Sequence, residues 1–411
     1  MLKLFRTTLS TFRLPGRWRL QLVALLLLVW VPAVQAATAY TFPGTLPPGC
    51  SAGSGGNYSC GPLTLGAGTT ITITSPTTIT VNGNFTTGAG AEINKDGAVA
   101  NLTLVVVNGI TDLGAGTILY GNLIGSLKVD TGNNSKVFGN ITTIAGVITI
   151  GNNNEIIGNL KTDSAAINIG NNSFVGDPTT VCNSDPVNGN ITTTIAGVIN
   201  VGTTTMIYGR LTTASGAINV GNNSKVYGKI SSTVAGAITV GNGVTVACKV
   251  SSAIGAITVG SGSTVTGGLS TDTGAITVGN NSNICGKVAT GDGAITIGAH
   301  ATVCEDVCAR KTGAITIGAD AEVHGNVGTG VAGAITVGTG AQVDGNVETA
   351  GAGAITIETK AIVKGGTDAD ASIAKDATVG KKTSSSGACI STITATFPKV
   401  RSREWRQIFM R

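Results

Sequence analysis

The stretch Gly255-Ala256-Ile257-Thr258-Val259-Gly260 recurs with few changes along most of this chain of 411 residues. Related copies end in glycines that lie 19 or 20 residues apart, with a single longer step of 32 residues. These anchor glycines are Gly151, Gly170, Gly202, Gly221, Gly241, Gly260, Gly279, Gly298, Gly318 and Gly338. Such a regular period is typical of a solenoid, in which equivalent coils stack on one another.

The residues within one coil predict short β-strands. Ile257 and Val259 alternate with Ala256 and Thr258, so the aliphatic side chains point to one side of the strand. Val265 and Leu269 continue this pattern in short segments separated by glycine. No apolar pattern with a period of 3.6 residues occurs in the repeats, which argues against helices. We predict an all-β fold, a single-stranded parallel β-helix of roughly a dozen coils of 19–20 residues, three-sided and right-handed.

Asparagine pairs follow many of the anchor glycines. Asparagine tolerates the left-handed backbone conformation and can hydrogen-bond to its neighbour in a stack. The pairs are Asn133-Asn134, Asn152-Asn153, Asn171-Asn172, Asn222-Asn223 and Asn280-Asn281. Later coils carry Ala299-His300, Ala319-Asp320 and Thr339-Gly340 instead, which favours a turn over a polar ligand-binding ridge.

The sequence divides into four segments. Residues 1–36 have a basic start, an apolar stretch and a small-residue ending at Ala36, so we expect an export signal peptide cleaved after Ala36. Residues 37–109 contain longer strand patterns out of phase with the repeats and are expected to form an N-terminal β cap. Residues 110–380 are the repeats, interrupted by an insertion at about 177–188. Residues 381–411 are a linker and a basic tail.

Charge argues against nucleic-acid binding. The chain has 26 Lys and Arg, of which five lie in the first 36 residues, so 21 remain against 21 Asp and Glu. The basic excess is local to the C-terminal tail, which could form a short amphipathic helix that docks to a partner or to an anionic membrane surface, or could be frayed. The candidate docking residues are Arg401, Arg403, Trp405, Arg406, Ile408, Phe409 and Arg411.

All eight cysteines follow the signal segment, and export permits disulfides. Cys50 and Cys60 bracket a flexible loop, and we predict a disulfide between them. Cys285 and Cys304 share one outward phase in consecutive coils, so they should lie side by side and could form a second bridge. The partners of Cys182, Cys248, Cys308 and Cys389 stay open.

The sequence predicts no enzyme, no cofactor and no metal site. Polysaccharide-cleaving β-helix enzymes need clustered carboxylates, but no three acidic residues share a phase in adjacent coils. The nearest approaches are Glu305-Asp306 and the pair Asp320 and Glu322. Cys304 and Cys308 with His300 and His324 could be taken for a metal site, but ligands on a flat wall do not converge on one ion.

One outer wall carries an ordered pattern of threonine. The outward residue between the two aliphatic residues of each anchor segment is usually Thr, and the neighbouring outward residue is usually Ala. This candidate interaction face contains Thr239, Thr258, Thr277, Thr296, Thr316, Thr336 and Thr356. Solenoid ice-binding proteins present faces of this kind, although threonine also suits exposed strand positions in general.

Two families share sequence features with this chain. The segment Ala39-Tyr-Thr-Phe-Pro-Gly-Thr-Leu-Pro-Pro-Gly-Cys50, the following Gly-Asn-Tyr-Ser-Cys60 and Ile79-Thr-Val-Asn-Gly-Asn-Phe85 resemble the exported region of MSHA (mannose-sensitive haemagglutinin) pilus-biogenesis protein Q of Gram-negative bacteria. The repeat, as in Ala319-Asp-Ala-Glu-Val-His-Gly-Asn-Val327, also resembles the polymer-forming bactofilins. Both resemblances imply a structural role and no catalytic residues.

We therefore expect an exported structural or interaction protein of the bacterial cell surface that is pilus-associated, adhesive or self-assembling. Its location would be the periplasm, the outer surface or the extracellular space, with no integral membrane span after signal cleavage. Expected partners are other surface or pilus proteins, a second copy end to end, or a glycan, and not nucleic acid. The alternatives are a carbohydrate- or ice-binding module using the Ala/Thr face and a polysaccharide-degrading β-helix enzyme.

Overall fold

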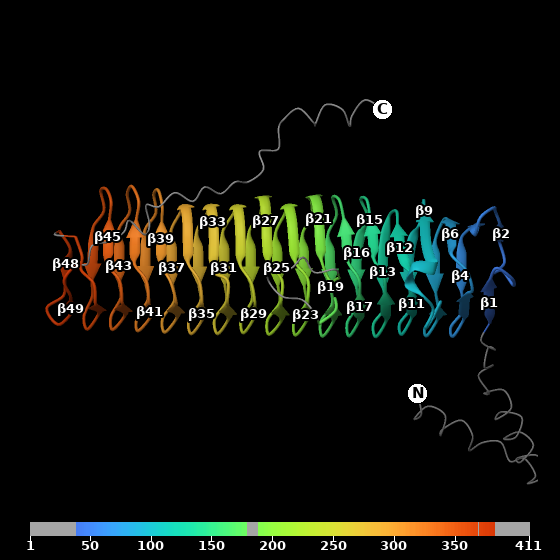
Figure 1. Ribbon diagram of the computed structural model, residues 1–411, viewed down its shortest axis with the longest axis horizontal. Coiled ribbons are helices and arrows are strands. Elements are labelled where there is room, and N and C mark those ends of the chain that lie inside the picture. The colour runs from blue at the N-terminus through green and yellow to red at the C-terminus, as the bar shows by residue number, and fades with distance from the viewer. Residues whose placement is uncertain (1–37, 179–187, 369, 383–411) are drawn as a thin grey trace, which may run out of the picture. The chain divides into compact units, whose positions relative to one another are not determined.

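The computed structural model of the protein describes residues 38–178, 188–368 and 370–382. From Ala39 onwards these residues form a stack of coils built from three long sheets of 17, 16 and 16 strands (Figure 1). Within these ranges the one helical element is a 3-10 turn, η1 (Val99–Asn101). The predicted all-β, three-sided parallel β-helix is confirmed, while its right hand stays a prediction.

Each regular coil adds one strand to each sheet in turn. Sheet A contains β1 (Ala39–Phe42), β5 (Thr70–Ile73), β8 (Glu92–Ile93), β11 (Ile118–Tyr120), β14 (Lys136–Phe138), β17 (Glu155–Ile157), β20 (Phe174–Val175), β23 (Met206–Ile207), β26 (Lys225–Val226), β29 (Thr245–Val246), β32 (Thr264–Val265), β35 (Asn283–Ile284), β38 (Thr302–Val303), β41 (Glu322–Val323), β44 (Gln342–Val343), β47 (Ile362–Val363) and β49 (Thr378–Val379).

Sheet B contains β2 (Cys50–Ala52), β3 (Asn57–Cys60), β6 (Thr77–Asn82), β9 (Leu102–Val107), β12 (Asn122–Gly125), β15 (Ile141–Thr143), β18 (Leu160–Thr162), β21 (Ile191–Ala196), β24 (Leu211–Ser215), β27 (Ile230–Ala235), β30 (Val250–Ile254), β33 (Leu269–Thr273), β36 (Val288–Asp292), β39 (Val307–Ala309), β42 (Val327–Thr329) and β45 (Val347–Thr349).

Sheet C contains β4 (Leu63–Leu65), β7 (Phe85–Thr87), β10 (Ile110–Leu113), β13 (Lys128–Thr131), β16 (Val147–Ile150), β19 (Ile167–Ile169), β22 (Ile199–Val201), β25 (Ile218–Val220), β28 (Ile238–Val240), β31 (Ile257–Val259), β34 (Ile276–Val278), β37 (Ile295–Ile297), β40 (Ile315–Ile317), β43 (Ile335–Val337), β46 (Ile355–Ile357) and β48 (Ser372–Ile373).

The stack has about 16 coils, as its 16-stranded sheets require, rather than the dozen expected. The difference arises because residues 39–109 also coil within the same three sheets. Leu63 pairs with Phe85, and Phe85 with Thr111, so these coils are 22 and 26 residues long and escape a search for a period of 19 or 20. At about 4.8 Å per strand, the stack is about 75 Å long.

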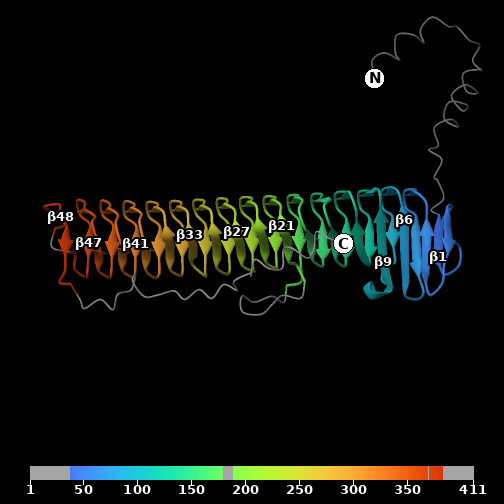
Figure 2. The same cartoon turned by 90° about the horizontal axis from the view of Figure 1, so that it is seen from above.

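The interior is a set of in-register aliphatic stacks. Ile257 pairs with Ile276, Val259 with Val278, and all four side chains are at most 1% exposed. Figure 2 shows the coils following one another at regular intervals along the length of the stack. Polar groups inside the corner that joins sheets C and A bond to neighbouring coils: Ser224 Oγ donates to the Gly202 carbonyl at 2.9 Å and accepts from the Thr205 N–H at 3.0 Å.

The predicted asparagine turns are confirmed in both respects. The second residue of each pair has a positive φ, between 53° and 58°, at Asn134, Asn153, Asn172, Asn223 and Asn281. His300, Asp320 and Gly340 occupy the same position in later coils with φ of 55°, 53° and 70°. The first asparagine of the pair bonds to the next coil, as Asn133 Oδ1 does with the Asn152 N–H at 2.8 Å.

The two ends of the stack differ. At the start, Phe42 is fully buried and meets Tyr58 edge to face at 4.8 Å, beside the antiparallel hairpin β2–β3. At the other end, Ile373 of β48 is 46% exposed. Strand edges are open at both ends, because β1 and β4 at the start and β48 and β49 at the other end each pair with one strand among the described residues. The ends therefore differ in how well the core is covered.

Three predicted segments lie wholly or mostly outside the described residues: the signal peptide 1–36, the insertion near 177–188 and the linker and tail 381–411. The longer step itself is confirmed, because Ile167 pairs directly with Ile199, 32 residues later. The described residues contain no helix long and apolar enough to span a membrane.

Candidate functional site

The predicted Ala/Thr face lies on the outside of sheet C. Its threonines pair in register from coil to coil, and all are exposed except the half-buried Thr336. The pairs run Thr239–Thr258–Thr277–Thr296–Thr316–Thr336–Thr356. The flanking alanines, such as Ala256 and Ala275, are exposed as well. The short strands place one Thr and one Ala per coil outward, which produces a flat, uncharged wall.

Asparagine continues this column towards the N-terminal end. Thr239 pairs with Asn219, which is followed by Asn200 and Asn168. Their side chains bond to each other, from Asn219 to Asn200 and from Asn200 to Asn168, each at 2.8 Å. These carboxamides are therefore used partly in holding the coils together, whereas no hydrogen bond joins the hydroxyls of Thr258 and Thr277.

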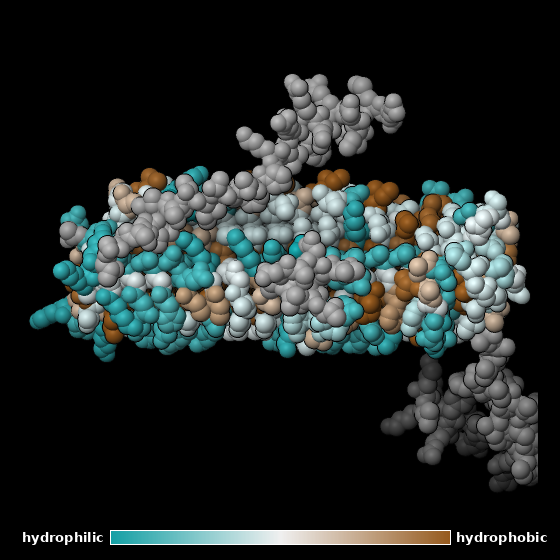
Figure 3. Space-filling view, in the orientation of Figure 1, coloured by the Kyte–Doolittle hydropathy of each residue, from teal (hydrophilic) through white to brown (hydrophobic). Residues whose placement is uncertain are grey.

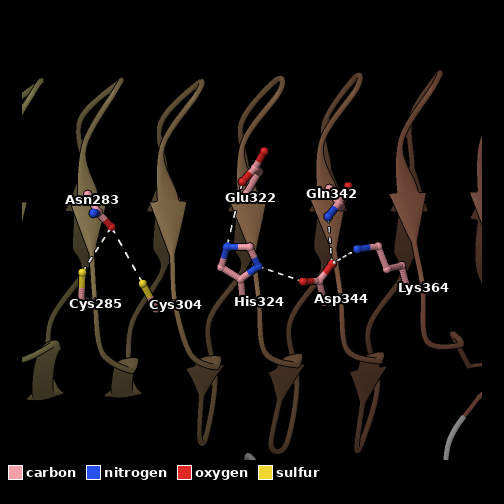
Figure 4. A network of polar contacts seen from close by, with 8 residues as sticks. All are labelled: Asn283, Cys285, Cys304, Glu322, His324, Gln342, Asp344 and Lys364. Atoms are coloured by element: carbon pink, nitrogen blue, oxygen red, sulfur yellow. Dashed lines mark hydrogen bonds and ion pairs between the residues drawn. The ribbon is translucent and has the colours of Figure 1, made fainter.

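A polar column runs along sheet A, where successive coils place Cys285, Cys304, His324, Asp344 and Lys364 at equivalent positions (Figure 4). His324 Nδ1 lies 2.8 Å from Asp344 Oδ2, and Lys364 Nζ lies 2.8 Å from Asp344 Oδ1. Gln342 Nε2 also donates to Asp344 Oδ1 at 2.9 Å. Asp344 thus collects three partners from three coils.

These contacts make Asp344 unusually acidic. Hydrogen bonds from Lys364 and His324 lower the pKa of the Asp344 carboxyl to about 2, because they stabilise its charged form. His324 faces Glu322 on its other side, with Nε2 4.0 Å from Glu322 Oε2. The cluster is a chain of polar contacts along a wall, and no hydrogen bond or ion pair among the described residues joins a nucleophile to its histidine.

Cys285 and Cys304 lie side by side, as predicted, but the predicted bridge between them is wrong: both thiols are free. Each sulfur faces the same Asn283 Oδ1, Cys285 Sγ at 3.5 Å and Cys304 Sγ at 3.9 Å (Figure 4). Equivalent positions of neighbouring parallel strands stand about 4.8 Å apart, which is wide for the Cβ atoms of a disulfide. Burial and a hydrogen bond to Cys285 raise the pKa of the Cys304 thiol.

The other cysteines are either disulfide-bonded or outside the described residues. Cys50 and Cys60 form the predicted disulfide across the β2–β3 hairpin, with a Cα–Cα distance of 4.0 Å. Cys248 and Cys308, whose state the sequence left open, are both disulfide-bonded. Cys182 and Cys389 lie outside the described residues.

The residues considered for metal binding do not meet. Cys304 follows β38 on sheet A, Cys308 lies in β39 on sheet B, and His300 occupies a turn. No group of three or more His, Cys, Asp or Glu side chains that could hold a metal occurs in the described part of the chain. Asp306, one of the acids noted in the sequence, instead accepts from the Asn326 N–H at 2.9 Å and pairs with Lys287 at 3.5 Å.

An apolar ridge was missed by sequence reasoning. Large aliphatic side chains project where sheet B turns into sheet C, with exposed fractions from 54% to 71%. This ridge consists of Leu127, Ile144, Ile195, Val234, Ile254 and Val331. Figure 3 shows apolar surface along the upper edge of the stack in that view, mostly in the N-terminal half. In the sequence, each of these residues is an aliphatic residue close to a glycine in the turn. The number of residues per coil varies at this turn, so these positions do not recur at a constant spacing and were not predicted.

The candidate docking residues from Arg401 to Arg411 lie outside the described residues, and their role stays a prediction. Comparison with protein-family models, with curated proteins and with solved structures found no match for this chain.

Proposed function

We propose that this protein is an exported structural rod that works at the bacterial cell surface by binding other molecules or a second copy of itself. Adhesion, association with a pilus and end-to-end assembly are the concrete forms of this proposal. The main support is the filled interior: aliphatic stacks such as Ile257–Ile276 and bonded polar groups such as Ser224 occupy the coils from one end to the other. A rod of this kind offers rigid walls and two ends.

The difference between the ends makes the C-terminal end the favoured point of attachment. Phe42 and the disulfide-closed hairpin cover the core at the start, whereas the last coil leaves Ile373 exposed. Open strand edges recruit other strands, and at the C-terminal end such an edge, in β48, also carries the exposed Ile373. Association through one end would produce pairs of rods, or a rod fixed to a partner, rather than long filaments.

Sedimentation and electron microscopy of the protein at increasing concentration test this proposal. We expect end-to-end pairs that Ile373→Lys abolishes and that Ile144→Lys, on the distant ridge, leaves intact. Monomers at every concentration would remove self-association, and side-by-side pairs would point to the ridge instead.

Export and attachment are tested in cells. We expect the mature protein to begin after Ala36 and to fractionate with the cell surface, as N-terminal sequencing and fractionation would measure. Removal of Thr383 to Arg411 should release the rod from that fraction if the tail docks it.

A second candidate, ice or glycan binding by the Ala/Thr face, is favoured by the in-register pairing of exposed Thr258, Thr277 and Thr296. A flat wall with a repeat of about 4.8 Å can match a regular ligand lattice. Thermal hysteresis and glycan-array measurements on wild type and on Thr277→Lys test it, with Ser251→Lys on sheet B as the control. No ice shaping and no glycan signal would eliminate this candidate. No specific observation favours the polysaccharide-degrading alternative.

A further inference from the structure

The two free thiols on sheet A have a separation set by the backbone. Asn283 pairs with Thr302, and Ile284 with Val303. Cys285 and Cys304 come directly after these strands and therefore occupy equivalent positions in neighbouring coils. Neighbouring strands stand about 4.8 Å apart. A disulfide needs its sulfurs about 2.0 Å apart, which requires the side chains to lean together. The contact of both sulfurs with Asn283 Oδ1 is compatible with upright, reduced side chains.

We propose that Cys285 and Cys304 form a two-thiolate site for a soft metal cation of the Cu(I) class. A metal–thiolate bond measures about 2.3 Å, so an ion between two sulfurs holds them about 4.6 Å apart, close to the strand spacing. Soft sulfur ligands select Cu(I) over harder cations. On binding, each thiol releases one proton, and one Cu(I) with two thiolates leaves a complex with a single negative charge.

The surroundings favour two-coordinate binding over a zinc site. Structural zinc takes four ligands, and the described residues offer no group of three or more metal-binding side chains. His324, in the next coil, is engaged by Asp344 at 2.8 Å. On the other side the equivalent position is Thr266, and the amide oxygen of Asn283 is a hard ligand suited to holding the thiols in place.

This site is independent of the rod's proposed structural role, because it uses neither an end of the stack nor the Ala/Thr face. It also differs from the other cysteines of the described residues. Cys50 and Cys60 are bonded to each other, and Cys248 and Cys308 are disulfide-bonded. Among the described residues, Cys285 and Cys304 are therefore the two thiols available for a ligand.

The test is a competition titration of the full-length mature protein, kept anaerobic, with Cu(I) supplied as its bicinchoninate complex. We expect one tightly held Cu(I) per chain and a new near-ultraviolet thiolate-to-copper absorption band. Cys285→Ser and Cys304→Ser should each weaken that site by at least about 100-fold, since either change removes half of the ligands. The double variant measures the background from the remaining cysteines.

Two further variants check that copper binding belongs to this pair of thiols and not to its neighbours in the column. Thr266→Ala and His324→Ala should bind Cu(I) as wild type does, and circular dichroism checks that all variants fold. Equal affinity of wild type and Cys304→Ser would overturn the proposal. It would also fail if peptide mapping showed Cys285 bonded to Cys304 in the isolated protein and the reduced protein took up no Cu(I).

Discussion

The side-chain oxygen of Asn152 accepts a hydrogen bond from the backbone N–H of Asn171, one coil further along, at 2.7 Å. The next residue, Asn153, turns the chain with a φ of 57°. One Asn-Asn pair therefore makes the turn and joins it to its neighbour. Because the bond crosses between coils, it also helps to hold their register.

Changes in this pair should separate its two tasks. We expect Asn152→Ala to lower the free energy of unfolding by about 1 kcal/mol, the usual net value of one hydrogen bond. Asn153→Ala should cost about 1–2 kcal/mol, because alanine resists the left-handed conformation. Asn153→Gly should be nearly neutral and is the matched control. Urea denaturation measures all three, and an equally destabilised glycine variant would contradict the role assigned to the left-handed conformation.

A glycine packed between coils should tolerate substitution by alanine far less than a glycine with open space around it. A Cβ on Gly158 would lie 2.0 Å from the Gly139 carbonyl oxygen, whereas one on Gly61 would meet nothing within 4 Å. We expect Gly158→Ala to destabilise the stack by roughly 3 kcal/mol or more through overpacking, and Gly61→Ala to change stability by less than about 0.5 kcal/mol. Yield of soluble protein and melting temperature test the pair.

Neighbouring residues of one strand should differ strongly in how much a substitution lowers stability. Ile276 is fully buried and Thr277 projects outward. Ile276→Ala should cost about 2–5 kcal/mol, since it opens a cavity in the aliphatic stack. Thr277→Val should stay within about 0.5 kcal/mol. If thermal unfolding ranked these two variants in the reverse order, the assignment of inside and outside would be wrong.

The disulfide of the first hairpin should protect one end only. Replacing Cys50 and Cys60 by alanine removes a short loop closure and should cost about 2–3 kcal/mol locally. In a solenoid each coil contacts its neighbours, so amide exchange should accelerate in β2 and β3 and remain slow in β31. Uniform acceleration along the rod would mean that the stack unfolds as a single unit.

Acid should weaken the cluster around Asp344. Its carboxyl has a pKa of about 2 in the folded chain, against about 3.9 in an unfolded one. The stabilisation is therefore present above pH 4 and is lost as the pH falls towards 2. Its side chain is 27% exposed, so we expect at most about 1 kcal/mol. Asp344→Asn should remove this part of the pH dependence, with Asp292→Asn as the comparison.

Much of the fold could be predicted because each coil repeats the same local rules. The alternation around Ile257 and Val259 determines which side chains face inward, and Gly260 with the following turn determines where the strand ends. The Ala/Thr face follows from the same alternation. The coils of residues 39–109 were missed because turns of 22 and 26 residues follow the same stacking without the same period.

The candidate site was only partly predictable. Cys285 and Cys304 were placed side by side by their common phase, but a shared phase does not state whether two sulfurs bond. Asp344, His324 and Lys364 share that phase too. Their contacts, however, depend on the rotamers of long side chains, and the spacing of residues in the sequence does not determine rotamers. The exposed ridge at Ile144 lies where the number of residues per coil varies, so a constant repeat length does not predict which side chains project there.

By itself, the sequence determined that the chain coils, which residues fill the coils and where left-handed turns occur, because these properties depend on alternation and residue type within about 20 residues. Only the tertiary structure decided how many coils there are, which end is covered and whether neighbouring thiols stay free. Those outcomes depend on distances between side chains in different coils, which are set by the stacking of backbones rather than by any local pattern.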